Sequence, residues 1–117
     1  MASTHDYEID SRNDNIQIYI NGQFFPRTDA KVSVMDSGYL LGDGVWEGIR
    51  LHNNHLIHLE KHLERLYEGA ETIQMDIGIS KSEMKLAIKK TLDKNGMISD
   101  VHIRLIVSRG IKSTPYQ

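Results

Sequence analysis

Two adjoining amphipathic segments in the middle of the chain constrain the fold more than any other feature. Apolar residues recur at helical spacing from Leu59 to Ile73, which predicts a helix that buries one face. A second helix is predicted to begin at Ser80, which forms a capping box with Glu83, and to end at Gly96, a typical C-cap. A helix pair of this kind needs an apolar surface to pack against.

Stretches that alternate apolar and polar residues flank the predicted helices and supply that surface. The pair Asn21-Gly22 is the strongest short signal for a hairpin turn, and Asn53-Asn54 closes a second hairpin. A short extended piece is predicted at residues 31–34. Strands are predicted at residues 16–20, 23–26, 45–52, 55–58 and 101–108.

Residues 36–44 connect the two hairpins and contain three glycines and two aspartates. This composition reads as a turn-rich connection and not as a regular element. Strands, then two helices, then a strand predict an α+β domain with a largely antiparallel sheet and both helices against one face. The 117 residues suffice for one such domain and are too few for two ordinary ones.

Composition and charge exclude several classes of function. Fourteen basic residues face sixteen acidic ones, so no basic field is available to attract nucleic acid or an anionic membrane. The absence of cysteine excludes disulfides, thiolate nucleophiles and thiolate zinc sites. No apolar run is long enough for a membrane span, and residues 1–15 form a polar, flexible arm without a signal-peptide core. The expected location is therefore cytoplasmic.

Two patterns carry only weak signals for a phosphate or a metal. The Gly42-Asp43-Gly44 stretch could cradle a phosphate, but a strand follows it where a phosphate loop would lead into a helix, so a tight turn is favoured. His52 and His55 face each other across the second hairpin and could hold zinc or nickel. No acidic third ligand accompanies them, so we expect a solvated hairpin tip and no metal.

The arginines of the strands are stronger candidates for a binding site. A period of two places Trp46, Gly48 and Arg50 on one face of their strand. An arginine beside an aromatic ring, near a glycine that permits close approach, can form one wall of a carboxylate pocket. The alternative is a surface arginine that pairs with an acid such as Glu47, and the pattern alone favours this alternative slightly.

The same two interpretations apply to Arg104, which shares a strand face with His102 and could instead pair with Asp100. Arg65 lies within the first predicted helix, one residue away from its apolar stripe. By pattern alone Arg65 reads as a solvated charge.

Three stretches, residues 34–50, 60–66 and 101–110, resemble the N-terminal motifs of the fold-type IV pyridoxal-phosphate enzymes. That family includes branched-chain aminotransferases, D-amino-acid aminotransferases, (R)-selective amine transaminases and aminodeoxychorismate lyases. The resemblance implies that residues 16–110 are the small α+β domain of a two-domain, homodimeric enzyme. Residues 111–117 would begin the connection to the large domain, and the catalytic lysine would lie beyond residue 117.

The resemblance also assigns roles to individual residues. Arg65 corresponds to the arginine that binds the phosphate of pyridoxal 5'-phosphate, which overturns its interpretation as a solvated charge. Trp46 takes the place of an aromatic residue that lines the substrate pocket, and Gly48 lets the substrate approach the backbone. Arg104 matches an arginine of the branched-chain enzymes that can meet a substrate carboxylate.

Two departures from the family pattern leave the substrate open. Leu41 and His102 stand where some branched-chain enzymes have pocket tyrosines. Residues 112–115 replace the arginine and histidine with which D-amino-acid enzymes trap the carboxylate.

The implied function is transfer of an amino group between an amino acid or amine and a 2-oxo acid, with the 117-residue chain inactive by itself. An aminodeoxychorismate-lyase-like enzyme is the second possibility. A stand-alone domain with a binding or dimerising role and no catalysis is the third.

Overall fold

The structure, a computed structural model, describes residues 9–112. The chain divides into two compact units, residues 1–30 and 31–117. In the first unit, β1 (Gln17–Ile20) and β2 (Gln23–Pro26) form an antiparallel hairpin. Asn21 and Gly22 both have positive φ at its turn, which confirms the hairpin predicted there. Residues 1–8 of the expected flexible arm lie outside the described residues, and Ser11–Asn13 form a short 3-10 helix.

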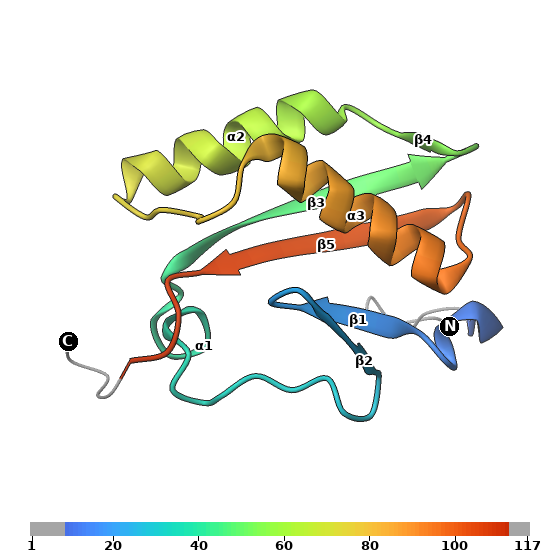
Figure 1. The fold of residues 1–117 in the computed structure, drawn as a ribbon, viewed down its shortest axis with the longest axis horizontal. Helices are drawn as coiled ribbons and strands as arrows, with labels where there is room; N and C mark the ends of the chain where they lie inside the picture. The colour runs from blue at the N-terminus through green and yellow to red at the C-terminus, as the bar shows by residue number, and fades with distance from the viewer. Residues whose placement is uncertain (1–8, 113–117) are drawn as a thin grey trace, which may run out of the picture. The chain divides into compact units, whose positions relative to one another are not determined.

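The second unit carries a three-stranded antiparallel sheet in the order β4-β3-β5 (Figure 1). Its central strand β3 pairs with β5 along nearly its whole length and with β4 only at Leu51 and His52. The elements are α1 (Ser37–Leu41), β3 (Gly44–His52), β4 (His55–Leu56), α2 (Leu59–Thr72), α3 (Lys81–Asn95) and β5 (Val101–Ser108). The α+β class with antiparallel pairing and two helices over one face is as the sequence predicts.

The core lies between one face of this sheet and the two long helices. Strand alternation turns Ile49 inward, where it packs against Leu63 and Leu66 of α2 and against Met84 and Ile88 of α3. Each of these side chains is at most 5% exposed. The capping box of Ser80 and Glu83 and the left-handed C-cap at Gly96 bound α3 where predicted.

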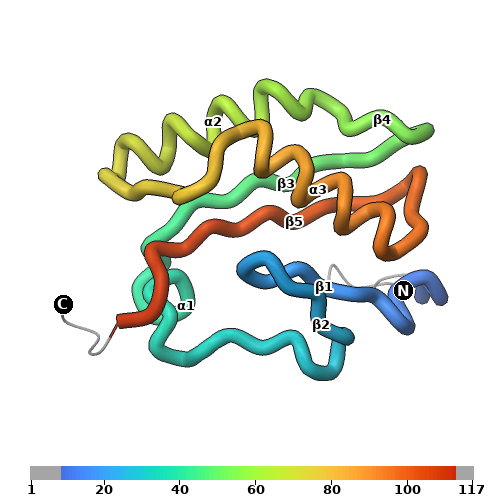
Figure 2. The backbone as a smooth tube through the Cα atoms, viewed as in Figure 1, coloured from blue at the N-terminus to red at the C-terminus, as the bar shows by residue number. Residues whose placement is uncertain are grey.

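The connection at residues 36–44 differs from the prediction because it contains the short helix α1. Asp36 caps this helix by accepting a hydrogen bond from the backbone of Gly38, and Gly42 ends it with φ of 66°. Asp36 also accepts a hydrogen bond of 2.9 Å from the Ser108 hydroxyl, and Ser37 N donates to Gly110 O. Figure 2 shows the end of β5 running beside α1. Two of the residues that predicted a turn-rich connection, Asp36 and Gly42, are thus the caps of a short helix.

The short extended piece predicted at residues 31–34 joins no sheet, and Val34 and Met35 lie in a turn that closes with Asp36 N donating to Ser33 O. The strand predicted at residues 55–58 is shorter, because His58 has φ of 55° and serves as the N-cap of α2.

Candidate functional site

Five of the predicted pocket residues share the sheet face that points away from α2 and α3. The register of β3 and β5 places Gly48 opposite Arg104 and Arg50 opposite His102, with Trp46 further along the same face. We call Trp46, Gly48, Arg50, His102 and Arg104 the strand-face group. The Arg104 guanidinium lies 4.4 Å from the centre of the Trp46 ring system, a cation–π contact. The structure therefore places Arg104 against the Trp46 ring, whereas the sequence pattern had placed Arg50 beside it.

Gly48 has no side chain to cover its backbone on this face, and the ring of His102 lies over it instead. A Cβ atom at Gly48 would lie only 2.8 Å from Cε1 of His102. The space that the sequence analysis left for a substrate is filled by an imidazole at the end of a rotatable side chain. A ligand that reached the Gly48 backbone from this face would have to displace that ring.

The remaining predicted residues lie apart from this contact. Arg50 extends to Asp100, with Nη2 4.0 Å from Oδ1, at an exposed ion pair. Leu41 is half exposed at the end of α1. His52 does pair with His55 across the hairpin, as predicted, but among residues 9–112 no group of three or more histidines and acids is arranged to hold a metal ion.

Arg65 does not lie in solvent unpaired. Its Nε lies 3.1 and 3.0 Å from the two carboxylate oxygens of Glu47, and its Nη2 lies 2.7 Å from Oε1. Nδ1 of His62 lies 2.7 Å from the same Oε1 and carries the hydrogen, since a carboxylate can only accept. We call Glu47, His62 and Arg65 the Arg65 cluster.

Burial and charge within the Arg65 cluster are unevenly distributed. The Glu47 side chain is 5% exposed, whereas that of Arg65 is 71% exposed. Hydrogen bonds from the Arg65 guanidinium lower the pKa of Glu47 against the opposing effect of burial, and His62 lowers it further. The same hydrogen bond raises the pKa of Arg65. The Arg65 cation of the cluster is therefore exposed to solvent, whereas the Glu47 carboxylate is buried.

Sequence reasoning missed Glu47 and His62 as members of a site. Glu47 alternates with Val45 and Ile49, so the period of two puts a carboxylate on the apolar face of its strand. An acid in such a position is seldom buried without a partner, and this signal could have pointed to Arg65.

The two groups of candidate residues lie on opposite faces of β3, because Glu47 faces the helices and Trp46 faces away. The structure therefore does not bring Arg65 together with the strand-face group on one surface. Within the described residues, the edge of β3 that turns away from β5 has no strand partner from Gly44 to Ile49.

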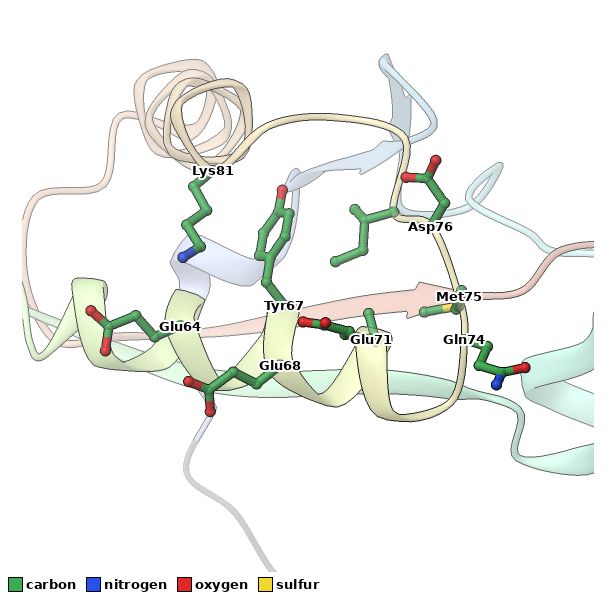
Figure 3. A pocket seen from close by; sticks show the side chains of 10 residues that line it. Glu64, Tyr67, Glu68, Glu71, Gln74, Met75, Asp76 and Lys81 are labelled. Carbon is green, nitrogen blue, oxygen red and sulfur yellow. The ribbon is translucent and has the colours of Figure 1, made fainter.

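Two depressions flank α2 and differ in charge. One, of about 370 Å³, is lined by His58, Lys61, His62 and Arg65. The other, of about 520 Å³, is shown in Figure 3 and is lined by acidic residues of α2 and the loop after it, with Lys81 as its basic residue. The carboxylates of Glu64, Glu68, Glu71 and Asp76 make this second depression unsuitable for an anion.

Comparison with known proteins identifies the class to which this fold and site belong. The sequence model described as "Amino-transferase class IV" matches residues 44–116. The chain belongs to this family. In the part of the chain that the structure describes, no helix is both long and apolar enough to cross a membrane.

Individual relatives agree with the family match. A putative branched-chain-amino-acid aminotransferase of Methanocaldococcus jannaschii is 45% identical over 82% of this chain and 33% of its own length. A D-alanine aminotransferase of Bacillus licheniformis is 37% identical over 81% of this chain and 33% of its own length. The chain thus spans about a third of the length of these relatives.

A solved structure shows the same arrangement of elements. The branched-chain aminotransferase of Thermoproteus uzoniensis, crystallised with norvaline, superposes with a TM-score of 0.73 at 30% identity. The match covers 86% of this chain and 34% of that one.

Proposed function

We propose that this chain is the small domain, residues 16–110, of a pyridoxal-phosphate-dependent aminotransferase. The enzyme transfers an amino group between an amino acid or amine and a 2-oxo acid. Residues 111–117 begin the connection to a large domain that supplies the catalytic lysine, and the names and lengths of the relatives support this division. We extend the proposal to a homodimer in the cytoplasm, as the family resemblance implies.

The Arg65 cluster is the observation that carries the proposal, because its chemistry suits the phosphate of the cofactor. A planar guanidinium that is 71% exposed offers a fork of N–H donors matched to phosphate oxygens. The adjoining depression adds Lys61, His58 and His62, and none of the described residues that line it is acidic. When bound, pyridoxal phosphate supplies the electron sink for the transfer. Arg65 and the basic residues of the adjoining depression would anchor its phosphate.

The strand-face group supports recognition of the substrate. Arg104 is fixed over the Trp46 ring and carries a charge that can pair with a substrate carboxylate. Trp46 is 58% exposed, and its flat apolar ring can pack against the substrate side chain. The ring of His102 covers Gly48 and limits the room beside the backbone. These residues suit an amino acid better than a simple amine, because an amine has no carboxylate to pair with Arg104.

An assay of the full-length enzyme tests this proposal. Branched-chain amino acids and D-alanine are offered as donors with a 2-oxo acid acceptor and saturating pyridoxal phosphate. We expect formation of the amino acid that corresponds to the acceptor. Pyruvate release from aminodeoxychorismate without any acceptor would indicate the lyase instead, and no turnover with any of these substrates would contradict the proposal.

The strand-face group leads to a prediction about specificity. We expect Trp46→Ala to change the ratio of kcat/KM for leucine to that for alanine by roughly tenfold, because the apolar ring distinguishes side chains by size. Removing the ring also frees Arg104, so KM for the 2-oxo acid should rise. Cofactor affinity should stay the same, since Trp46 and Arg65 lie on opposite faces of β3.

The control for this prediction is Ile98→Ala, which removes an exposed apolar side chain that is outside the strand-face group. It should leave the ratio unchanged. Equal losses for leucine and alanine in Trp46→Ala, together with loss of bound cofactor, would show that Trp46 acts on the fold and not on the substrate.

A further inference from the structure

We propose that Glu47 is a positioning residue that fixes the Arg65 guanidinium for the cofactor phosphate, with His62 also bonded to the Oε1 atom of this carboxylate. This inference deepens the proposed function and rests on it. Glu47 itself touches neither the cofactor nor the substrate in this proposal. It acts only through Arg65.

One edge of the Arg65 guanidinium is bonded to Glu47, and the other edge is left for a ligand. Glu47 accepts hydrogen bonds from Nε and Nη2, which form the side edge of the guanidinium plane. The N–H groups of Nη1 and the second N–H of Nη2 point away from this edge, because the guanidinium is planar with fixed donor directions. They form the fork that can meet two phosphate oxygens. The carboxylate therefore determines which edge of Arg65 is offered.

Burial makes Glu47 a firm anchor for an otherwise mobile side chain. Glu47 extends from the central strand and is 5% exposed, and its Oε1 atom is also fixed by Nδ1 of His62 at 2.7 Å. Arg65 is mostly exposed and would otherwise sample many rotamers. Holding it beforehand removes part of the ordering cost that phosphate binding has to overcome.

Charge alone predicts the opposite effect, which makes the proposal testable. A carboxylate beside a phosphate site repels the bound anion, so its neutralisation should strengthen binding if electrostatics dominated. Positioning predicts that Glu47→Gln weakens binding, since an amide keeps the size of the side chain but offers only one acceptor oxygen to the guanidinium. The sign of the change therefore separates the two effects.

The experiment measures dissociation constants of pyridoxal phosphate and of pyridoxal, which lacks the phosphate, by absorbance in the full-length enzyme. For Glu47→Gln we expect roughly three- to tenfold weaker binding of pyridoxal phosphate and unchanged binding of pyridoxal. The double variant with Arg65→Ala should bind no more weakly than Arg65→Ala alone, because Glu47 acts through Arg65. Asp100→Asn is the matched control, since Asp100 also pairs with an arginine but lies at the exposed end of the sheet.

Variants of His62 keep the test decisive if Glu47→Gln fails to fold, which circular dichroism and thermal melting reveal. His62→Asn places an amide N–H near the position of Nδ1 and should largely preserve cofactor affinity. His62→Leu removes this donor and should weaken binding of pyridoxal phosphate but not of pyridoxal.

The outcomes distinguish this inference from the proposed function. Unchanged phosphate-dependent binding in Arg65→Ala would overturn the role of Arg65 and the inference with it. If Arg65→Ala weakens binding while Glu47→Gln leaves it unchanged or tightens it, only the inference is overturned. Equal weakening of pyridoxal and pyridoxal phosphate in Glu47→Gln would reveal a purely structural role and would also overturn it.

Discussion

Replacing Arg65 with alanine is expected to weaken binding of pyridoxal phosphate roughly ten- to a hundredfold. The variant loses a charge-assisted fork aimed at a dianion, and the side chains that remain in the depression, His58, Lys61 and His62, offer no planar fork in its place. Lysine at this position should restore only part of the affinity, because it keeps the charge but cannot present two parallel N–H groups. The measurement is cofactor dissociation, followed by absorbance in the full-length enzyme.

The structure adds a second consequence that has to be separated from the first. Without Arg65, the buried Glu47 carboxylate keeps only His62 as a partner among residues 9–112, so Arg65→Ala should also lower the melting temperature of the cofactor-free protein. The double variant of Arg65→Ala with Glu47→Gln also removes the buried negative charge of Glu47, so it should recover part of the lost melting temperature. Its cofactor affinity should remain as weak as that of Arg65→Ala.

Lys90→Ala is the matched control, because it removes an exposed positive charge from α3 rather than from α2. It should change neither cofactor affinity nor melting temperature. Unchanged cofactor affinity in Arg65→Ala would show that Arg65 serves as the partner of Glu47 and does not bind the cofactor phosphate.

The fold was predictable where local and tertiary signals agree. The apolar stripe of α2 and the alternation of β5 turn toward the core the residues that their periods predict. The capping box of α3 marks the start of that helix. The helix α1 was not predictable in this way. Its five residues are too few to show a period, and its stability comes from Asp36, whose carboxylate is held by Ser108 seventy-two positions along the chain.

The candidate site was predictable only in part, and for a similar reason. The period of a strand places Trp46 and Arg50 on one face, but it cannot show that Arg104 of another strand stacks on Trp46. Glu47 shows the limit most clearly. Its partners come from a helix that follows fifteen and eighteen positions later, and the sequence analysis weighed Glu47 only as a partner for arginines of its own sheet.

The helix that carries Arg65 depends on Leu63 for its attachment to the sheet. We expect Leu63→Ala to lower the free energy of unfolding of the chain by about 2–5 kcal/mol. Leu63 is 0% exposed and packs in the cluster formed by Ile49, Leu66, Met84 and Ile88, so truncation leaves a cavity that neighbours on two helices and a strand would have to fill. Such a loss is a large part of the stability of a small domain.

Leu86→Ala tests whether this effect comes from the core and not from leucine in a helix. Leu86 lies in α3 and is 56% exposed, so the same chemical change should cost within about 0.5 kcal/mol. Urea denaturation followed by circular dichroism measures both variants, and an unchanged slope with denaturant shows that the free energies are comparable. Equal losses in the two variants would contradict the two-layer core. A large loss in Leu63→Ala alone would establish that packing beneath α2 holds the helix from which Arg65 reaches Glu47.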